Sequence, residues 1–284
     1  MIDEGKGRAI LVLHGGMGDE TSWSRVTDLL RDRFRVVRLT RRQYRLDVPR
    51  KVTMADEVAQ VREVAATLDR PVLIGHSSGA VLALEALVAD PGRYSGAVLY
   101  EPPIVLDEPL GGAKLEPARA AIAAGKPGPA LRIFLRDVVH TGPLLAAVAG
   151  LVLGAKPEWA GRVERQLDDS DAIDALGSRL SAYAKIDLPV LLLGGDKSPG
   201  GRGGRTRHEL AAEVFTRVRI WRSSTESAAS SAGVSSTLPM AFAHLAIEAA
   251  FTCSHSSTRS RAVAVDSVDS STSTVSAASA AYRS

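Results

Sequence analysis

The chain has almost no cysteine and no long hydrophobic run. Cys253 is the single cysteine in 284 residues, which excludes an intrachain disulfide and any zinc site built on several cysteines. The amino-terminal residues include no apolar signal region, and no uninterrupted apolar stretch reaches the ~18 residues that a membrane-spanning helix requires. These absences predict a cytoplasmic protein without a membrane partner.

The sequence also lacks an excess of one charge and a nucleotide-binding motif. Its formal net charge is +3, and its basic residues are scattered among acidic ones rather than clustered as on a nucleic-acid-binding surface. No Gly-x-Gly-x-x-Gly motif follows a predicted strand, and the glycine-rich residues 200–205 lack the Lys-Ser/Thr of a P-loop. Histidines and carboxylates show no metal-ligand spacing. We therefore expect no cofactor, no metal and no nucleic-acid partner.

One stretch combines a buried strand, a serine in a glycine-flanked turn and an apolar helix. Val72 to Ile74 is a short apolar run, and residues 75–79 read Gly-His-Ser-Ser-Gly. Apolar residues then recur at helical spacing as far as residue 88. A serine between a strand and a helix needs a sharp, strained turn to expose its hydroxyl, and glycines leave room for that turn. This order is that of a nucleophile elbow with Ser77 at its tip.

Further strands and helices alternate with this unit. Buried strands are predicted at residues 8–13, 35–39, 96–100, 189–193 and 218–221, and helices at 24–33, 53–68 and 205–215. Thr53 is expected to cap its helix, because acidic residues occupy the first turn. Such alternation predicts an α/β protein with a mostly parallel sheet and helices on both faces.

The alternation stops between residues 104 and 186. This segment is rich in alanine and leucine and is broken by glycine and proline, so it predicts several helices. We interpret it as a helical lid between two parts of the core, residues 1–103 and 187–253. Its very apolar stretch, Leu135–Leu153, is either a substrate-facing surface or the core of the lid. Residues 254–284 are rich in Ser, Thr and Ala and are predicted to be disordered.

With these motifs established, residues 9–222 resemble the α/β-hydrolase fold family in its serine hydrolase form. His14-Gly15-Gly16 matches the HG motif that follows the first central strand of the family, and residues 75–79 match its elbow. The resemblance implies a three-layer α/β fold with a helical lid insertion. It also implies that Ser77 is a nucleophile that forms an acyl-enzyme with its substrate.

The resemblance assigns roles to neighbours of both motifs. The oxyanion hole would consist of backbone N–H groups of Ser78 and Gly16, with Met17 the next candidate. His14 and His76 would be structural residues that hold these loops. Family members usually have an antiparallel hairpin before the first central strand, whereas seven residues precede that strand here, so the sheet is expected to be short at that edge.

The acidic partner implied by the resemblance has two candidates. Family members usually carry it about three residues beyond a glycine after the strand predicted at 189–193, and Asp196 lies slightly before that place. Some members carry it after the strand that follows the elbow helix, where Glu101 stands between a strand end and two prolines. A carboxylate fixed in this way is suited to orient an imidazole, so Glu101 is preferred and Asp196 stays open.

The base of the family is a histidine just after the last strand, and residues 222–231 contain none. His244 comes next and begins a segment that matches the family's final helix, displaced by a Ser/Ala-rich insertion. We take it as the candidate base, ahead of His255, His208 and His140. Composition changes abruptly near Arg222, which suggests a shifted reading frame as a further hypothesis; translating the other frames of the gene tests it.

Two functions follow from these features. The first is a serine hydrolase that cleaves an ester, amide or similar small acyl substrate through Ser77. The second is a catalytically inactive relic of the fold, or a binding protein, that lacks a properly placed histidine. A small-molecule acyl substrate is the only partner that the first function implies, and the sequence does not determine the oligomeric state.

Overall fold

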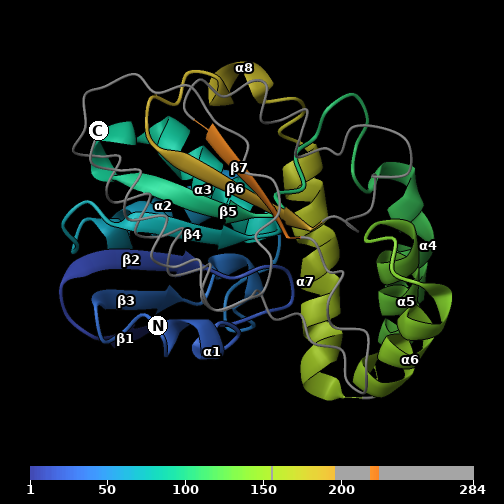
Figure 1. Ribbon diagram of the computed structural model, residues 1–284. Helices are drawn as coiled ribbons and strands as arrows, with labels where there is room; N and C mark the ends of the chain where they lie inside the picture. The colour runs from blue at the N-terminus through green and yellow to red at the C-terminus, as the bar shows by residue number, and fades with distance from the viewer. Residues whose placement is uncertain (155, 196–217, 224–284) are drawn as a thin grey trace.

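A seven-stranded sheet forms the centre of the computed structural model, which describes residues 1–154, 156–195 and 218–223 (Figure 1). The strand order is β1-β3-β2-β4-β5-β6-β7, and all neighbours are parallel except β1 and β3. The strands are β1 (Ile2–Glu4), β2 (Arg8–Leu13), β3 (Phe34–Leu39), β4 (Val72–His76), β5 (Gly96–Tyr100), β6 (Val190–Gly195) and β7 (Val218–Ser223). The predicted mostly parallel sheet is confirmed.

Alternate residues of the central strands bury their side chains on opposite faces of the sheet. In β2, Leu11 and Leu13 belong to one buried cluster, whereas Ile10 and Val12 belong to another. Helices α2 (Met54–Ala65) and α3 (Ser78–Ala89) contribute to the first cluster, and α1 (Ser24–Thr27) contributes to the second. Burial on both faces explains why these strands read as continuous apolar runs.

The start of α2 agrees with the sequence prediction, whereas the end of α1 does not. Thr53 caps α2 through a reciprocal capping box with Asp56, as its sequence predicts. The helix predicted over residues 24–33 is shorter than expected: α1 ends at Thr27. The Thr27 hydroxyl donates to the Ser24 carbonyl at 3.0 Å, and the next residues continue as turns.

One edge of the sheet holds a strand that the sequence pattern did not predict. β1 has three residues and pairs antiparallel with β3, with Ile2 opposite Arg38. Ion pairs of Asp3 with Arg35 and of Glu4 with Arg38 cross between the two strands. A three-residue strand is too short for a periodic pattern, and its cross-strand partners are remote in the sequence.

Residues 104–186 contain helices and no strand in the part that the structure describes. They are the 3₁₀ turn η3 (Gly112–Leu115), α4 (Glu116–Ala123), α5 (Pro127–Asp137), α6 (Pro143–Gly154), α7 (Pro157–Asp174) and α8 (Leu180–Tyr183). Figure 1 shows α7 across the carboxyl ends of the strands, with α4 to α6 on its far side. A separate buried cluster joins α4, α5 and α7.

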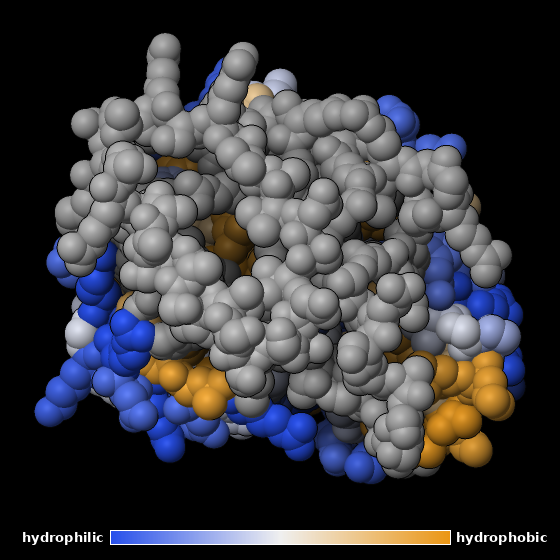
Figure 2. All heavy atoms as spheres, in the orientation of Figure 1, coloured by the Kyte–Doolittle hydropathy of each residue, from blue (hydrophilic) through white to orange (hydrophobic). Residues whose placement is uncertain are grey.

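The apolar stretch Leu135–Leu153 is largely exposed where it forms α6. Leu144 and Leu151 are 79% and 78% exposed, while Ala146 and Gly150 are buried. Figure 2 shows hydrophobic side chains gathered at the lower right, where α6 lies in Figure 1. This helix therefore supplies little of the core of its own segment. None of the helices in the described ranges is long and apolar enough to cross a membrane.

The close approach of α3 to β2 yields a first prediction. A Cβ on Gly79 would lie 2.4 Å from the carbonyl oxygens of Leu13 and His14, which are backbone atoms rather than the ends of flexible side chains. Alanine normally favours a helix over glycine by about 1 kcal/mol. We expect Gly79→Ala instead to lower the free energy of unfolding by about 2 kcal/mol or more, because the clash outweighs propensity. Urea denaturation followed by circular dichroism measures this.

Gly92→Ala is the matched control. Gly92 lies in a 3₁₀ turn after α3, and a Cβ there meets nothing within 4 Å. The control should change the unfolding free energy by no more than about 0.5 kcal/mol. Equal effects of the two substitutions would show that the contact between α3 and β2 is not tight.

Candidate active site

Ser77 stands on a strained turn between β4 and α3. Its backbone angles are φ 51° and ψ −126°, in a region that non-glycine residues rarely occupy. Its N–H donates to the Tyr100 carbonyl at 2.8 Å, and its carbonyl accepts from the N–H of Ala80 at 2.8 Å. The residue is half-buried. Ser77 therefore adopts the geometry expected for the tip of a nucleophile elbow.

Two glycines make this turn sterically possible. A Cβ on Gly75 would lie 2.5 Å from the Cα of Ala80, and one on Gly79 would strike the end of β2. A side chain at Gly75 would push β4 and α3 apart, and one at Gly79 would push α3 away from the end of β2. The strain at Ser77 persists because strand, turn and helix are packed too closely to relax.

The loop after β2 lies against the elbow. The N–H of Gly18 donates to the Gly15 carbonyl at 3.3 Å, and Met17 within that turn has φ 57°. A Cβ on Gly15 would lie 2.8 Å from His76 Nδ1, so the loop contacts the last residue of β4. Ser78 is the first residue of α3, and its N–H has no acceptor within the helix. The expected oxyanion-hole residues thus lie in two segments that contact each other.

His14 is held by both ring nitrogens. Nδ1 donates to the Gly15 carbonyl at 2.8 Å, and Nε2 accepts from the N–H of Arg41 at 3.0 Å. Burial, reinforced by the Arg41 cation, lowers the pKa of His14 to about 4. A neutral imidazole with both nitrogens occupied does not act as a base, which agrees with the structural role expected for it.

His76 and Glu101 lie at the carboxyl ends of neighbouring strands beside the elbow. The His76 ring stacks on Tyr100 with centroids 5.1 Å apart and contacts Trp23 at 5.9 Å. Burial lowers the pKa of His76, and the Glu101 carboxylate opposes that shift. Glu101 has φ 48°, and its N–H donates to the Leu193 carbonyl at 3.0 Å. Of the two candidate acids, Glu101 is the one whose backbone is described, and it lies at the same sheet edge as the elbow.

Asp196 and His244 lie outside the described residues, as do His208 and His255 and the helix predicted over 205–215. His140, the remaining described histidine, is exposed in the turn between α5 and α6. The described ranges hold no group of three or more His, Cys, Asp or Glu residues arranged to bind a metal ion.

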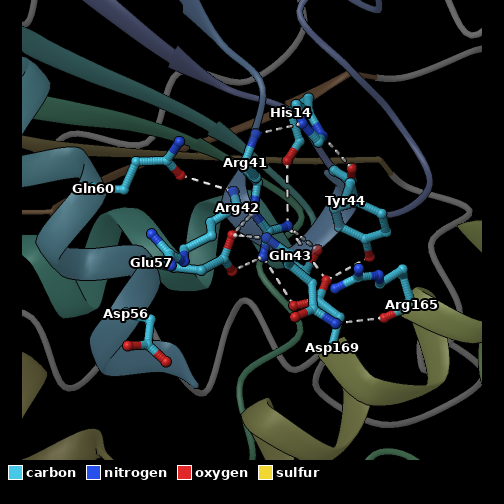
Figure 3. A network of polar contacts seen from close by, with 12 residues as sticks. His14, Arg41, Arg42, Gln43, Tyr44, Asp56, Glu57, Gln60, Arg165 and Asp169 are labelled. Atoms are coloured by element: carbon cyan, nitrogen blue, oxygen red, sulfur yellow. Dashed lines mark hydrogen bonds and ion pairs between the residues drawn. The ribbon is translucent and has the colours of Figure 1, made fainter. Parts of the chain in front are cut away.

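A buried arginine beside the elbow is the main feature that the sequence did not predict. Arg41 is fully buried directly after β3, and its guanidinium donates to Glu57, to Asp169 on α7 and to Ser78 Oγ, the last at 2.6 Å (Figure 3). Tyr44 adds a hydrogen bond to Asp169 at 2.6 Å. Although burial lowers it, the two carboxylates hold the pKa of Arg41 above its usual value. The sequence offered one sign of this role: Arg41 follows the end of a predicted parallel strand, and functional residues of α/β sheets gather at that edge.

The sequence profile of the Alpha/beta hydrolase family matches residues 10–265. This chain belongs to the alpha/beta hydrolase family. The matched region includes both the elbow and the loop after β2, so the candidate site lies within the part of the chain that defines the family. No curated protein sequence is significantly similar to the chain.

Solved structures show the same hydrolase fold at low sequence identity. An alpha/beta hydrolase from Sphaerobacter thermophilus is 21% identical with a TM-score of 0.70, and the match covers 87% of this chain and 94% of that one. A thermophilic esterase from Thermogutta terrifontis is 19% identical with a TM-score of 0.56, over 78% and 82% of the two chains. A meta-cleavage product hydrolase from Pseudomonas fluorescens is 16% identical with a TM-score of 0.57, over 78% and 84%.

The depressed pKa of His14 predicts how the stability of this hydrolase depends on pH. The unfolded chain binds a proton at His14 near pH 6.5, whereas the folded chain does so near pH 4. The stabilisation is therefore complete above pH 6.5 and is lost as the pH falls toward 4, by about 3 kcal/mol in all. We expect the difference in unfolding free energy between wild type and His14→Gln to shrink by this amount from pH 7 to pH 4.

Urea denaturation at a series of pH values measures that difference. Comparing wild type with the variant cancels the titration of the acidic residues and of His76, which both proteins share. A difference that stays constant with pH would mean that His14 titrates normally in the folded protein.

Proposed function

We propose that this alpha/beta hydrolase is a serine hydrolase that cleaves an ester, amide or similar small acyl substrate through an acyl-enzyme on Ser77. The observation that carries the proposal is the strained, half-buried elbow conformation of Ser77 at the carboxyl edge of the sheet. Further support comes from the loop containing Gly16 and Met17, which contacts the elbow. Backbone amides of this loop and of Ser78 would stabilise the oxyanion of a tetrahedral intermediate.

The mechanism requires a base and an acid besides the serine. A serine hydroxyl is a weak nucleophile until an imidazole accepts its proton. We propose His244 as that imidazole, from the resemblance, and Glu101 as the carboxylate that orients it, with Asp196 as the alternative. The position of Glu101 favours it, since its strand adjoins the strand that leads to Ser77. His14 is unsuited to the role, because both of its nitrogens are engaged.

Labelling with a fluorophosphonate probe tests the nucleophile. The wild type should react covalently, and Ser77→Ala should lose the label completely, since the probe bonds to an activated serine oxygen. Ser95→Ala is the control, because Ser95 is buried and precedes β5, at the opposite end of the strands from Ser77. A folded wild type that takes up no label would refute the serine hydrolase and favour a binding protein of this fold.

Hydrolysis of p-nitrophenyl acetate separates the two candidate acids. Replacing the carboxylate that orients the imidazole should lower kcat by roughly 10³-fold or more, because the imidazolium that forms loses its counter-charge. We expect this loss in Glu101→Gln and near-normal kcat in Asp196→Asn. His244→Gln should lose at least as much activity, because it removes the imidazole itself. The reverse order for the two acidic residues would assign the role to Asp196.

A further inference from the structure

Three side chains on one face of α7 reach the loop after β2 or the arginine beside it. Arg162, Gln166 and Asp169 are spaced four and three residues apart, which places them on the same side of a helix. Arg162 Nη1 donates to the Met17 carbonyl at 3.1 Å, and its Nη2 pairs with Asp19 at 2.8 Å. Arg162 therefore binds this loop at two residues, Met17 and Asp19.

Gln166 and the apolar side of α7 pack on the same loop. A Cβ on Gly16 would lie 1.7 Å from Gln166 Oε1, so the side-chain amide lies directly against the Gly16 backbone. The Met17 side chain packs on a buried cluster to which α7 contributes Val163 and Leu167. The position of the loop thus depends on α7 as well as on β2.

Asp169 reaches the elbow through Arg41. Asp169 Oδ1 accepts from Arg41 Nη2 at 2.9 Å, and Arg41 Nη1 donates to Ser78 Oγ at 2.6 Å. The backbone N–H of Arg41 also donates to His14 Nε2, at the base of the loop after β2 (Figure 3). Both segments that carry the candidate oxyanion-hole amides are therefore linked to one helix.

The helix is itself held firmly. Arg50 forms ion pairs with Glu164 and with Asp168, the second at 2.9 Å. At the end of α7, the Asp174 carboxylate accepts hydrogen bonds from the backbone amides of residues 110–112. These contacts fasten α7 along its length, so it can serve as a fixed reference for the groups that its other face contacts.

We propose that α7 is a positioning element of the oxyanion hole, in which Arg162, Gln166 and Asp169 hold the two amide-bearing segments in register. The inference rests on the serine hydrolase function proposed above. Preorganised donors stabilise a developing charge only when neighbouring groups fix them in place. A helix of the segment predicted as a lid thereby helps to hold the catalytic backbone in place.

Arg162→Gln and Arg50→Gln form a matched pair that tests this role. Each removes an arginine that binds two polar partners across the boundary between α7 and another segment, but only Arg162 contacts the loop after β2. Hydrogen exchange followed by mass spectrometry on peptides spanning residues 14–20 reports on the loop without requiring activity. Kinetics with p-nitrophenyl acetate and the rate of fluorophosphonate labelling report on the oxyanion hole.

We expect Arg162→Gln to accelerate exchange in that loop and to lower kcat and the labelling rate roughly tenfold, less than the 10²–10³-fold loss caused by removing a donor outright. KM should change little, since the interaction strengthens only in the transition state. Arg162→Lys should restore part of kcat, because it keeps a cation beside Asp19. Arg50→Gln should stay much closer to wild type in both assays, because the Asp174 hydrogen bonds and the buried cluster still hold α7 in place.

Unchanged loop exchange in Arg162→Gln would overturn the proposal. If the wild type is active, faster loop exchange in Arg162→Gln together with an unchanged kcat would also overturn it. A wild type that takes up no label would refute the serine hydrolase, and the positioning role with it. In that case, faster exchange in Arg162→Gln would still show that α7 holds the loop, so failure of the function and failure of the contact are distinguishable.

Discussion

The backbone strain at Ser77 is the constraint on which the rest of the site depends. A positive φ at a serine costs on the order of 1–3 kcal/mol and survives only where neighbouring structure leaves no alternative. Here Gly75 and Gly79 bring β4, α3 and the end of β2 into contact with no side chain between them. Backbone packing thus holds Ser77 in this conformation at the carboxyl edge of the sheet.

A second constraint is the buried charge of Arg41. Burying a cation is costly unless carboxylates and hydrogen bonds replace its water, and Glu57 and Asp169 supply that replacement. Such a network is weak evidence for stability, but its geometry is demanding. It joins α2, α7 and the segment after β3, and it places the guanidinium against Ser78. The strained residue, Ser77, is therefore followed directly by Ser78, the residue that the paired Arg41 contacts.

Much of this architecture was predictable because local chemistry specifies it. The central strands β2, β4, β5 and β6 are mainly apolar runs, and α2 carries its own cap at Thr53. The elbow was predictable for the same reason. The turn at Ser77 requires small residues on both sides of it, and Gly75 and Gly79 meet that requirement within five consecutive residues. The short β1 was not predictable, because cross-strand contacts with β3 settle it. The end of α1 at Thr27 was not predicted either.

The succession of strands and helices along the chain, the elbow and the glycines that permit it are therefore properties of the sequence by itself, since each depends on residues close together in the chain. Only the tertiary structure decided that Arg41 is a buried hub rather than part of a basic surface loop, and that Arg162 of α7 reaches Met17. Those contacts join residues more than a hundred positions apart, and no local pattern of charge or hydropathy distinguishes an arginine that will be paired in the core from one that stays in water.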